Sequence, residues 1–343
     1  MQRKNMKKGK HTFKEFTSKP EFSSLLILLV MFTLTAILQN NFFEIKSIMR
    51  NINAFAPLIL VTMGQAVVMI SGGIDLSSGT ALSLLSCVLT SIMKKNDPIT
   101  GLYAIIIALV VAVLLGFING FGVGYLRIPS IILTFATSFI WLGIALFLRP
   151  TPGGESVPWF AIFYNFSSLK DVSGFFGTLG GFLPPALILI LIGCLIWWVI
   201  SRTKTGRYIY AVGGNSESAY ESGINTARTQ IIAYIINAIF IYLATLFFVG
   251  QTGSGDARMG DPLTLRSVAA AVVGGIALSG GRGNVYFALV GALILSFVNK
   301  IIFFANIPYA YQTLVGGVIV IVAIAISQAY ISYSTKTKEI KIG

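Results

Sequence analysis

One acidic residue lies inside the apolar part of the sequence, directly after two glycines and an isoleucine. It is Asp75, within residues 71–79, which read SGGIDLSSG. An ionised carboxylate at the centre of a bilayer costs about 2.5 to 3.5 kcal/mol on insertion scales, whereas capping a helix that starts at Leu76 returns only about 1 kcal/mol. We therefore expect Asp75 to lie in a polar cavity or near an interface. There it contacts a solute, organises a broken helix, caps a helix or carries a proton.

A second glycine-rich stretch resembles the first. Residues 72–79 read GGIDLSSG and residues 274–281 read GGIALSGG, so Gly, Gly, Ile, Leu, Ser and Gly are shared. We interpret this as an internal duplication with a broken helix in each copy, although two glycine-rich turns could also converge by composition. Unwound backbone at depth is tolerated where it lines a cavity. The predicted pathway residues are Ser71, Gly72, Gly73, Asp75, Ser77, Gly274, Gly275 and Ser279.

The composition indicates an integral membrane protein. Only 11% of the 343 residues are charged and 55% are hydrophobic, with a mean hydropathy of +0.82. The net charge of +13 does not require nucleic acid, because seven of the 25 cations precede the first apolar run, where they face anionic lipid. Cys87 and Cys194 lie in apolar segments and His11 is the only histidine, so we expect neither a disulfide framework nor a metal site.

The apolar runs predict an all-α polytopic protein with about ten membrane spans and no separate soluble domain. The predicted spans are 22–38, 54–70, 76–93, 102–126, 131–148, 183–200, 231–249, 268–278, 285–305 and 311–331. They form one transmembrane domain, 22–331, between a basic tail, 1–21, and a carboxyl-terminal tail, 332–343. The first run is read as a retained anchor because no A-x-A cleavage site follows it.

Both termini are expected in the cytoplasm. With ten spans and an inside amino terminus, the inside segments hold 16 of the 25 cations and the remaining segments hold nine. This excess agrees with the tendency of cytoplasmic loops to be basic. A long connection at 149–181 is then outside, and another at 201–230 is inside. On span 102–126, Gly116, Gly120 and Gly124 are spaced by four, which predicts close packing against a neighbouring helix.

The inside connection contains a predicted short helix. Residues 210–225 read YAVGGNSESAYESGIN. Asn215 can cap a helix of about two turns, Glu217 favours its positive end, and Gly223 suits a left-handed stop. Glu217 and Glu221 share one face. Such a helix either lies on the membrane surface or docks into a cytoplasmic partner.

No nucleotide site is expected in this chain. Residues 278–282, LSGGR, resemble a nucleotide-contacting signature of ABC ATPases, but the sequence has no GxxxxGK[ST] loop to hold MgATP. We interpret LSGGR as a glycine-rich turn with Arg282 at the cytoplasmic interface. ATP, if it is used, must be hydrolysed by another chain.

Three segments resemble the permease subunits of ribose-type and other monosaccharide ABC importers, in a larger group that includes branched-chain amino acid permeases. They are GGIDLSSG at 72–79, GRYIYAVGGNSESAYESGIN at 206–225 and AAAVVGGIALSGGRGN at 269–284. Ser78, Ser218 and Tyr220 depart from the residues usual there, and Arg266 lies near where an acid is often found. These departures bear on the substrate more than on the family.

The resemblance implies an ATPase pair on the cytoplasmic side, with MgATP bound there, a sugar-binding protein outside, and a second permease copy in a homodimer or heterodimer. It also implies a location in the bacterial cytoplasmic membrane. The residues implied in ATPase coupling are Gly213, Gly214, Asn215, Glu217, Ala219, Glu221 and Gly223.

From the sequence we therefore predict a permease subunit that moves a monosaccharide and has no catalytic residues or bound cofactor of its own. Four alternatives stay open. They are a secondary transporter that uses Asp75 as an ion or proton site, an ABC permease for a branched-chain amino acid, an ABC permease for a nucleoside, and a membrane scaffold that does not transport.

Overall fold

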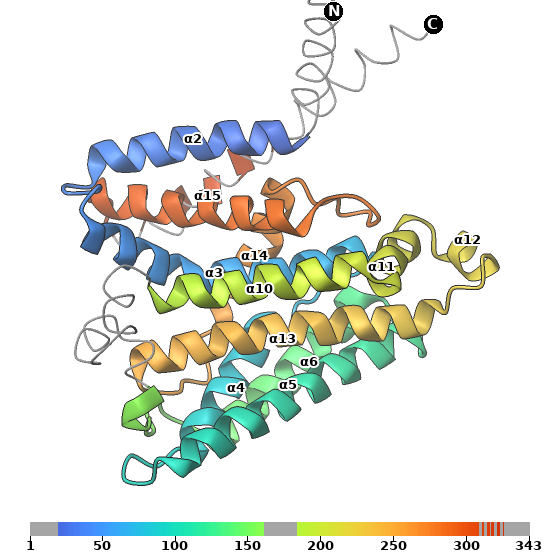
Figure 1. Cartoon of the computed structure of the whole chain (residues 1–343), viewed down its shortest axis with the longest axis horizontal. Helices are drawn as coiled ribbons and strands as arrows, with labels where there is room; N and C mark the ends of the chain where they lie inside the picture. Colours follow the sequence, from blue (N-terminus) through green and yellow to red (C-terminus); the bar gives the residue numbers. More distant parts are fainter. Residues whose placement is uncertain are drawn as a thin grey trace, which may run out of the picture.

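The computed structural model describes residues 20–160, 184–308 and scattered positions between 311 and 325. Its named elements are all α-helices, as the sequence predicts, and they lie roughly side by side (Figure 1). In chain order they are α2 (Pro20–Leu38), α3 (Ile45–Ile70), α4 (Ser78–Ile92), α5 (Ile99–Gly124), α6 (Ser130–Leu148), α10 (Pro185–Arg202), α11 (Lys204–Gly214), α12 (Ser216–Glu221), α13 (Thr226–Thr252), α14 (Asp261–Val273) and α15 (Val285–Phe304).

Six helices in the described ranges are long and apolar enough to cross a membrane, namely α3, α5, α6, α10, α13 and α15. The helices α4 and α14 have 15 and 13 residues, which is about 22 and 20 Å of helix against a hydrocarbon core of about 30 Å. The predicted tails, apart from residues 20 and 21, and most of the predicted span 311–331 lie outside the described residues. The count of about ten spans and the side on which the termini lie remain predictions.

The predicted span 268–278 is misplaced. The helix found there, α14, begins seven residues earlier at Asp261 and ends at Val273. Hydropathy overlooks its first turn because Asp261 and Arg266 are charged, although Pro262 suits the start of a helix. The apolar letters after Val273 belong to a turn rather than to a helix, since Gly275 has a left-handed φ of 92°.

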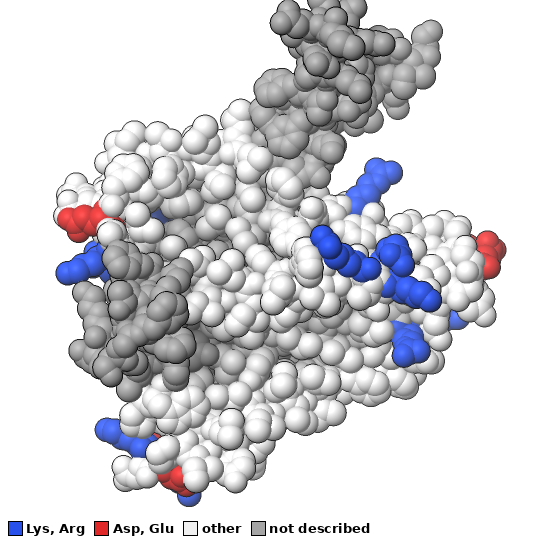
Figure 2. Space-filling model, viewed as in Figure 1, with Lys and Arg blue, Asp and Glu red and all other residues white. Residues whose placement is uncertain are grey.

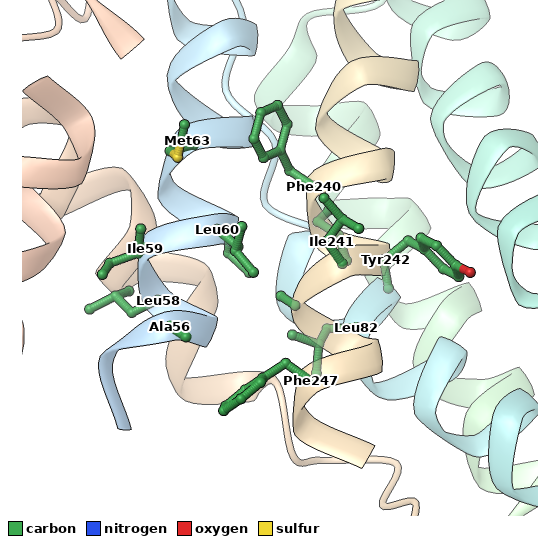
Figure 3. Close-up of a cluster of buried hydrophobic side chains, with 14 of the residues drawn as sticks. Ala56, Leu58, Ile59, Leu60, Met63, Leu82, Phe240, Ile241, Tyr242 and Phe247 are labelled. Atoms are coloured by element: carbon green, nitrogen blue, oxygen red, sulfur yellow. The ribbon is translucent and has the colours of Figure 1, made fainter. Parts of the chain in front are cut away.

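The helices α3 and α13 form the centre of the bundle. Their side chains interlock along much of their length, with Leu60 of α3 and Phe240 and Phe247 of α13 lying between the two helices (Figure 3). The outer helices α5, α6 and α10 are mostly exposed along their apolar windows. A bundle with a buried centre and apolar outer faces is typical of a protein surrounded by lipid.

Three glycines of α5 allow α13 to pack closely against α5, as their spacing predicts. A Cβ on Gly116 would lie 2.7 Å from Tyr234 O, one on Gly120 would lie 2.5 Å from Ile231 Cα, and one on Gly124 would lie 2.7 Å from Ala227 O. The two backbones therefore touch along about two turns of each helix.

The structure contains an internal repeat, but in a different register from the one predicted. The pattern Gly72, Asp75, Gly79, Leu82 recurs 181 positions later (253 minus 72) as Gly253, Asp256, Gly260, Leu263. The same offset superposes α3 on α13, α4 on α14 and α5 on α15 in chain order. The carboxyl end of α3 meets the amino end of α13, because Gln230 Nε2 donates to Ser71 O at 2.7 Å. The two units therefore run in opposite directions.

Reciprocal hydrogen bonds join the two units where α4 and α14 begin. The Gly79 N–H donates to Thr264 Oγ1 at 3.1 Å, and the Gly260 N–H donates to Ser83 Oγ at 2.9 Å. Each bond is the other shifted by 181 positions. The two short helices thus start from one point, and an extended segment, 71–77 or 253–260, leads to each.

The predicted equivalence of 72–79 with 274–281 is therefore wrong. Both runs end a helix through the same kind of turn, which requires a glycine in the left-handed region. In that turn Gly72 (φ 90°) corresponds to Gly275 (φ 92°), not to Gly274. The six shared letters are therefore out of register with the turn as well as with the repeat.

Charged side chains gather at the two ends of the bundle and leave an uncharged band between them on the face shown in Figure 2. The end formed by α11 and α12 carries exposed cations contributed by several elements. They are Arg127, Arg202, Lys204, Arg207, Arg228 and Arg282. Because lipid tails exclude charge, this distribution sets the bundle across a bilayer with α11 and α12 at one surface.

Replacing Gly120 by leucine tests the contact between α5 and α13. The added side chain would meet the backbone of Ile231, so we expect a loss of about 1 to 3 kcal/mol and a lower thermal unfolding midpoint in detergent. Gly143 on α6 is the matched control, because a Cβ there meets nothing within 4 Å. Equal midpoints for Gly120→Leu and Gly143→Leu would contradict the close packing.

Candidate functional site

The segment 71–77, between α3 and α4, is the break predicted from the two glycines. Helix α3 ends with the Gly72 N–H donating to Met69 O and the Gly73 N–H donating to Val68 O, both at 3.0 Å. Gly72 has a left-handed φ of 90°, so glycine is required there. Ser71 lies at this end, 1% exposed, with its hydroxyl donating to Val68 O at 2.7 Å.

Two hydroxyls of α6 satisfy the backbone of this segment. The Ile74 N–H donates to Ser130 Oγ at 3.1 Å, and the Leu76 N–H donates to Thr134 Oγ1 at 2.9 Å. Extended backbone at membrane depth has no water to bond with, so such side-chain partners are needed. The first turn of α6 therefore holds the break in its extended form.

The carboxylate of Asp75 is buried, 3% exposed, and both its oxygens accept hydrogen bonds from the protein. Oδ1 accepts from the Ser77 N–H at 2.8 Å and from the Ser77 hydroxyl at 2.7 Å, while Oδ2 accepts from Asn237 Nδ2 at 2.8 Å. The helix α4 begins at Ser78 rather than at Leu76, so Asp75 forms a turn just before it. In this conformation the carboxylate organises the break and is closed to a solute.

The network continues into two further helices. Asn119 of α5 donates to Ser77 Oγ at 2.8 Å and accepts from the Thr137 hydroxyl of α6 at 2.9 Å. Gln65 of α3 lies within 3.2 Å of Ser78 Oγ. Asp75 and Ser77 are thus joined to α3, α5, α6 and α13 through buried polar side chains, which strongly define the geometry of the break.

Sequence reasoning missed the amide side chains of this network. Gln65, Asn119 and Asn237 each lie within a largely apolar run, and the residues near them in sequence do not include their partners in this network. One signal was available. Because a buried amide without a hydrogen-bond partner is costly, each amide in an apolar run implies a partner elsewhere in the chain. Their partners are far away in sequence, so the pattern alone could not identify them.

The predicted pathway and coupling glycines meet at one backbone junction. The Gly281 N–H donates to Ile70 O at 2.9 Å, and a Cβ on Gly213 would fall onto that same Ile70 oxygen. A Cβ on Gly280 would lie 2.8 Å from Gly72 Cα. The end of α3, the end of α11 and the turn at 277–283 are therefore in contact without side chains between them. We call this contact the glycine junction.

The remaining predicted pathway residues do not gather around Asp75. Gly274 and Gly275 end α14, where a Cβ on Gly274 would fall onto Phe287 O of α15. Ser279 is exposed in the turn beside the glycine junction. The structure thus places Asp75 and Ser77 in one buried network. Ser71 and Gly72 lie at the glycine junction, next to Ser279.

The short helix is present as predicted. Asn215 Oδ1 accepts from the Ser218 N–H at 2.9 Å at the start of α12, and Gly223 follows its end with a left-handed φ of 81°. Glu217 and Glu221 are exposed, whereas Ala219 is buried, 5% exposed, against its own chain. The side chains of α12 available to a partner therefore exclude Ala219.

A hollow of about 1180 Å³ lies beside α12. It is bounded by the end of α5, by α12 and by the start of α13. Its lining includes Arg127, Glu217, Tyr220, Glu221, Ile224 and Gln230. Tyr220, 70% exposed, presents its ring there. A hollow with an exposed aromatic and mixed charges can receive a segment of another protein.

Replacing Gly213 by alanine tests the glycine junction. The added methyl would fall onto Ile70 O and close to Gly281 N, so we expect a lower thermal unfolding midpoint of the purified protein. Its neighbour Gly214 is the matched control, because a Cβ there meets nothing within 4 Å. If Gly214→Ala lowers the midpoint as much as Gly213→Ala, the junction is not a close contact.

Known proteins match this chain over all of the segments described above. The family described as "Branched-chain amino acid transport system / permease component" matches residues 47–324. The ribose import permease protein RbsC of Escherichia coli strain K12 is 30% identical over 310 residues, 89% of this chain and 93% of that protein.

The autoinducer 2 import system permease protein LsrC of Yersinia pestis is 30% identical over 301 residues, 88% of this chain and 82% of that protein. No solved structure matches the chain significantly. The matched range contains the segment 71–77, the glycine junction and α12.

Proposed function

The chain belongs to the family of branched-chain amino acid transport system permease components, and we propose that it forms the membrane pathway of an ABC importer for a monosaccharide. It is a multi-pass protein of the bacterial cytoplasmic membrane. The observation that carries the proposal is α12, a capped helix projecting beside a hollow at the basic end of the bundle. A separate ATPase, which would bind MgATP, contacts the permease at α12 and drives transport.

Two relatives support a small hydroxylated solute as substrate. The proteins at 30% identity are named as import permeases for ribose and for autoinducer 2. The buried polar groups around the break are hydroxyls and amides, apart from Asp75, whose charge is already paired with internal donors. Neutral hydrogen-bonding groups suit a neutral polyol better than an ion.

The distribution of charge supports the topology expected from the sequence. The exposed cations at the α11 and α12 end agree with the excess of basic residues in cytoplasmic loops. We therefore place α12 and both termini in the cytoplasm, with about ten spans in all. The opposite end, where Arg149 donates to Thr90 O at 2.6 Å, faces the outside and an extracytoplasmic sugar-binding protein.

A second permease copy and two ATPases complete the proposed importer. The apolar outer faces of α5, α6 and α10 are surrounded by lipid, and a homodimer or heterodimer would cover part of the outer surface. A carrier that used Asp75 as its ion or proton site would need that carboxylate to be reachable. Both its oxygens are occupied and it is 3% exposed, which favours the ATP-driven importer.

Uptake in cells tests the substrate class. Cells without this gene should lose ATP-dependent uptake of one labelled pentose or hexose, and the purified chain alone should hydrolyse no ATP because it lacks a phosphate-binding loop. Ribose, other sugars, autoinducer 2, nucleosides and branched-chain amino acids are measured in parallel. Loss of amino acid uptake with every sugar unaffected would contradict the sugar assignment.

Replacing Tyr220 by alanine tests docking at α12. The exposed ring lines the hollow, so its loss should reduce uptake by the reconstituted importer about tenfold, as expected for an aromatic contact residue. Tyr208→Ala on α11 is the matched control, since Tyr208 is also exposed but lies outside the hollow. Ala219→Arg would instead test the packing of α12, because Ala219 is buried. Normal transport by Tyr220→Ala would contradict docking there.

A further inference from the structure

One face of α13 carries three polar side chains that match the segment 71–77. Gln230, Tyr234 and Asn237 are spaced by four and then three, so they lie along the same side of the helix. Gln230 bonds with Ser71, Tyr234 lies over Gly73, and Asn237 reaches Asp75. We call these three residues the α13 polar face.

The bonds at the two ends of this face are specific. Gln230 Nε2 donates to Ser71 O at 2.7 Å, and its Oε1 lies 3.1 Å from Ser71 Oγ, whose one proton it shares with Val68 O. Asn237, which is fully buried, donates to Asp75 Oδ2 at 2.8 Å and lies 3.4 Å from Ser78 Oγ. Between them, a Cβ on Gly73 would lie 2.8 Å from the Tyr234 hydroxyl oxygen. The break is thus hydrogen-bonded to α13 at two points, with the Tyr234 side chain close to Gly73 between them.

The internal repeat shows that this fold does not need such a face. Subtracting 181 from the three positions gives Met49, Asn53 and Ala56 on α3, the helix that corresponds to α13 in the repeat, just as the segment 253–260 corresponds to 71–77. Neither Met49 nor Ala56 can make the bonds of Gln230 or Asn237. The outer turn still forms, with the Arg258 N–H donating to Asp256 Oδ1 at 2.9 Å, as Ser77 does to Asp75. The α13 polar face therefore has a role beyond building the turn.

Helix α13 also connects directly to α12. Only residues 222–225 separate the two helices, and Asn225 Oδ1 caps α13 by accepting from the Arg228 N–H at 2.8 Å. Gln230 itself lines the hollow beside α12. A displacement of α12 is therefore passed to the start of α13 over a single short, capped turn.

We propose that Gln230 and Asn237 are positioning residues that hold the segment 71–77 to α13, so that movement of α12 moves the break. This inference rests on the proposed function. The segment 71–77 follows α13, while the segment 253–260, which has Met49 and Ala56 at the positions equivalent to the two amides, does not follow α3. Loss of either amide leaves ATP hydrolysis running but separates it from opening of the pathway.

Exchanging the carboxylate and the amide tests the pair directly. In Asp75→Asn the charge-assisted bond is replaced at best by a neutral bond between two amides, and in Asn237→Asp two carboxylates face each other. The double variant restores one donor facing one acceptor, and the oxygen of the amide introduced before α4 can still accept from Ser77. Asp256→Asn is the matched control at the equivalent outer turn.

The readout is the number of sugar molecules imported per ATP hydrolysed by the reconstituted importer. We expect each single variant to lower this ratio about tenfold, the factor for one lost charge-assisted hydrogen bond, and the double variant to return to within about twofold of the original protein. Asp256→Asn should leave it unchanged. A double variant no better than the single ones, or single variants with a normal ratio, would overturn the proposal.

A second variant covers the case in which the single changes at Asp75 or Asn237 prevent folding. Gln230→Met copies the residue that α3 carries at the equivalent place and should also lower the ratio. Amide hydrogen exchange of residues 71–77 in the purified chain provides a readout independent of transport, and we expect it to be at least about tenfold faster in Gln230→Met. Unchanged exchange would overturn the positioning role, whereas absence of ATP-driven uptake by the unaltered protein would contradict the proposed function alone.

Discussion

The segments 71–77 and 253–260 interrupt helices in a protein that is surrounded by lipid, and their buried N–H and C=O groups must be satisfied without bulk water. Side chains of neighbouring helices meet this constraint. Ser130 and Thr134 bond the segment 71–77, and Ser83 and Ser86 of α4 bond the segment 253–260. The hydroxyls spaced along α4 and α6 therefore follow from the presence of broken backbone.

The internal repeat divides the protein into two units of like architecture and unlike chemistry. Both have a long helix, an extended segment, a short helix and a second long helix, and they join where α4 and α14 begin. The segment 71–77 is bound by amides from α13. The segment 253–260 is bound by hydroxyls of α4 and by the backbone of Gly153, whose N–H donates to Gly255 O at 2.9 Å and whose C=O accepts from the Gly255 N–H at 2.8 Å. The segment 71–77, which lies toward the basic end of the bundle, has the more connected polar network. The proposed positioning residues, Gln230 and Asn237, thus belong to the helix that directly follows α12.

Local features of the sequence predicted local features of the fold. Hydropathy located most of the helices, and capping chemistry at Asn215 and Gly223 predicted α12, because each depends on residues near in sequence. The same reasoning misplaced α14, whose first half is exposed and contains the charged residues Asp261 and Arg266. It also paired the wrong glycine runs, since six shared letters outweighed the sparser pattern of the true repeat. The partner of Asp75 is Asn237, 162 positions away, and no local pattern could identify it.

The glycines of α5 have a consequence for how α13 can move. Helices that interlock through side chains resist sliding, because each ridge must climb out of its groove. At Gly116, Gly120 and Gly124 the α5 surface is smooth, and α13 rests on it backbone to backbone. Resistance to sliding therefore comes less from α5 than from α3, whose side chains interlock with those of α13 and whose end is hydrogen-bonded to Gln230.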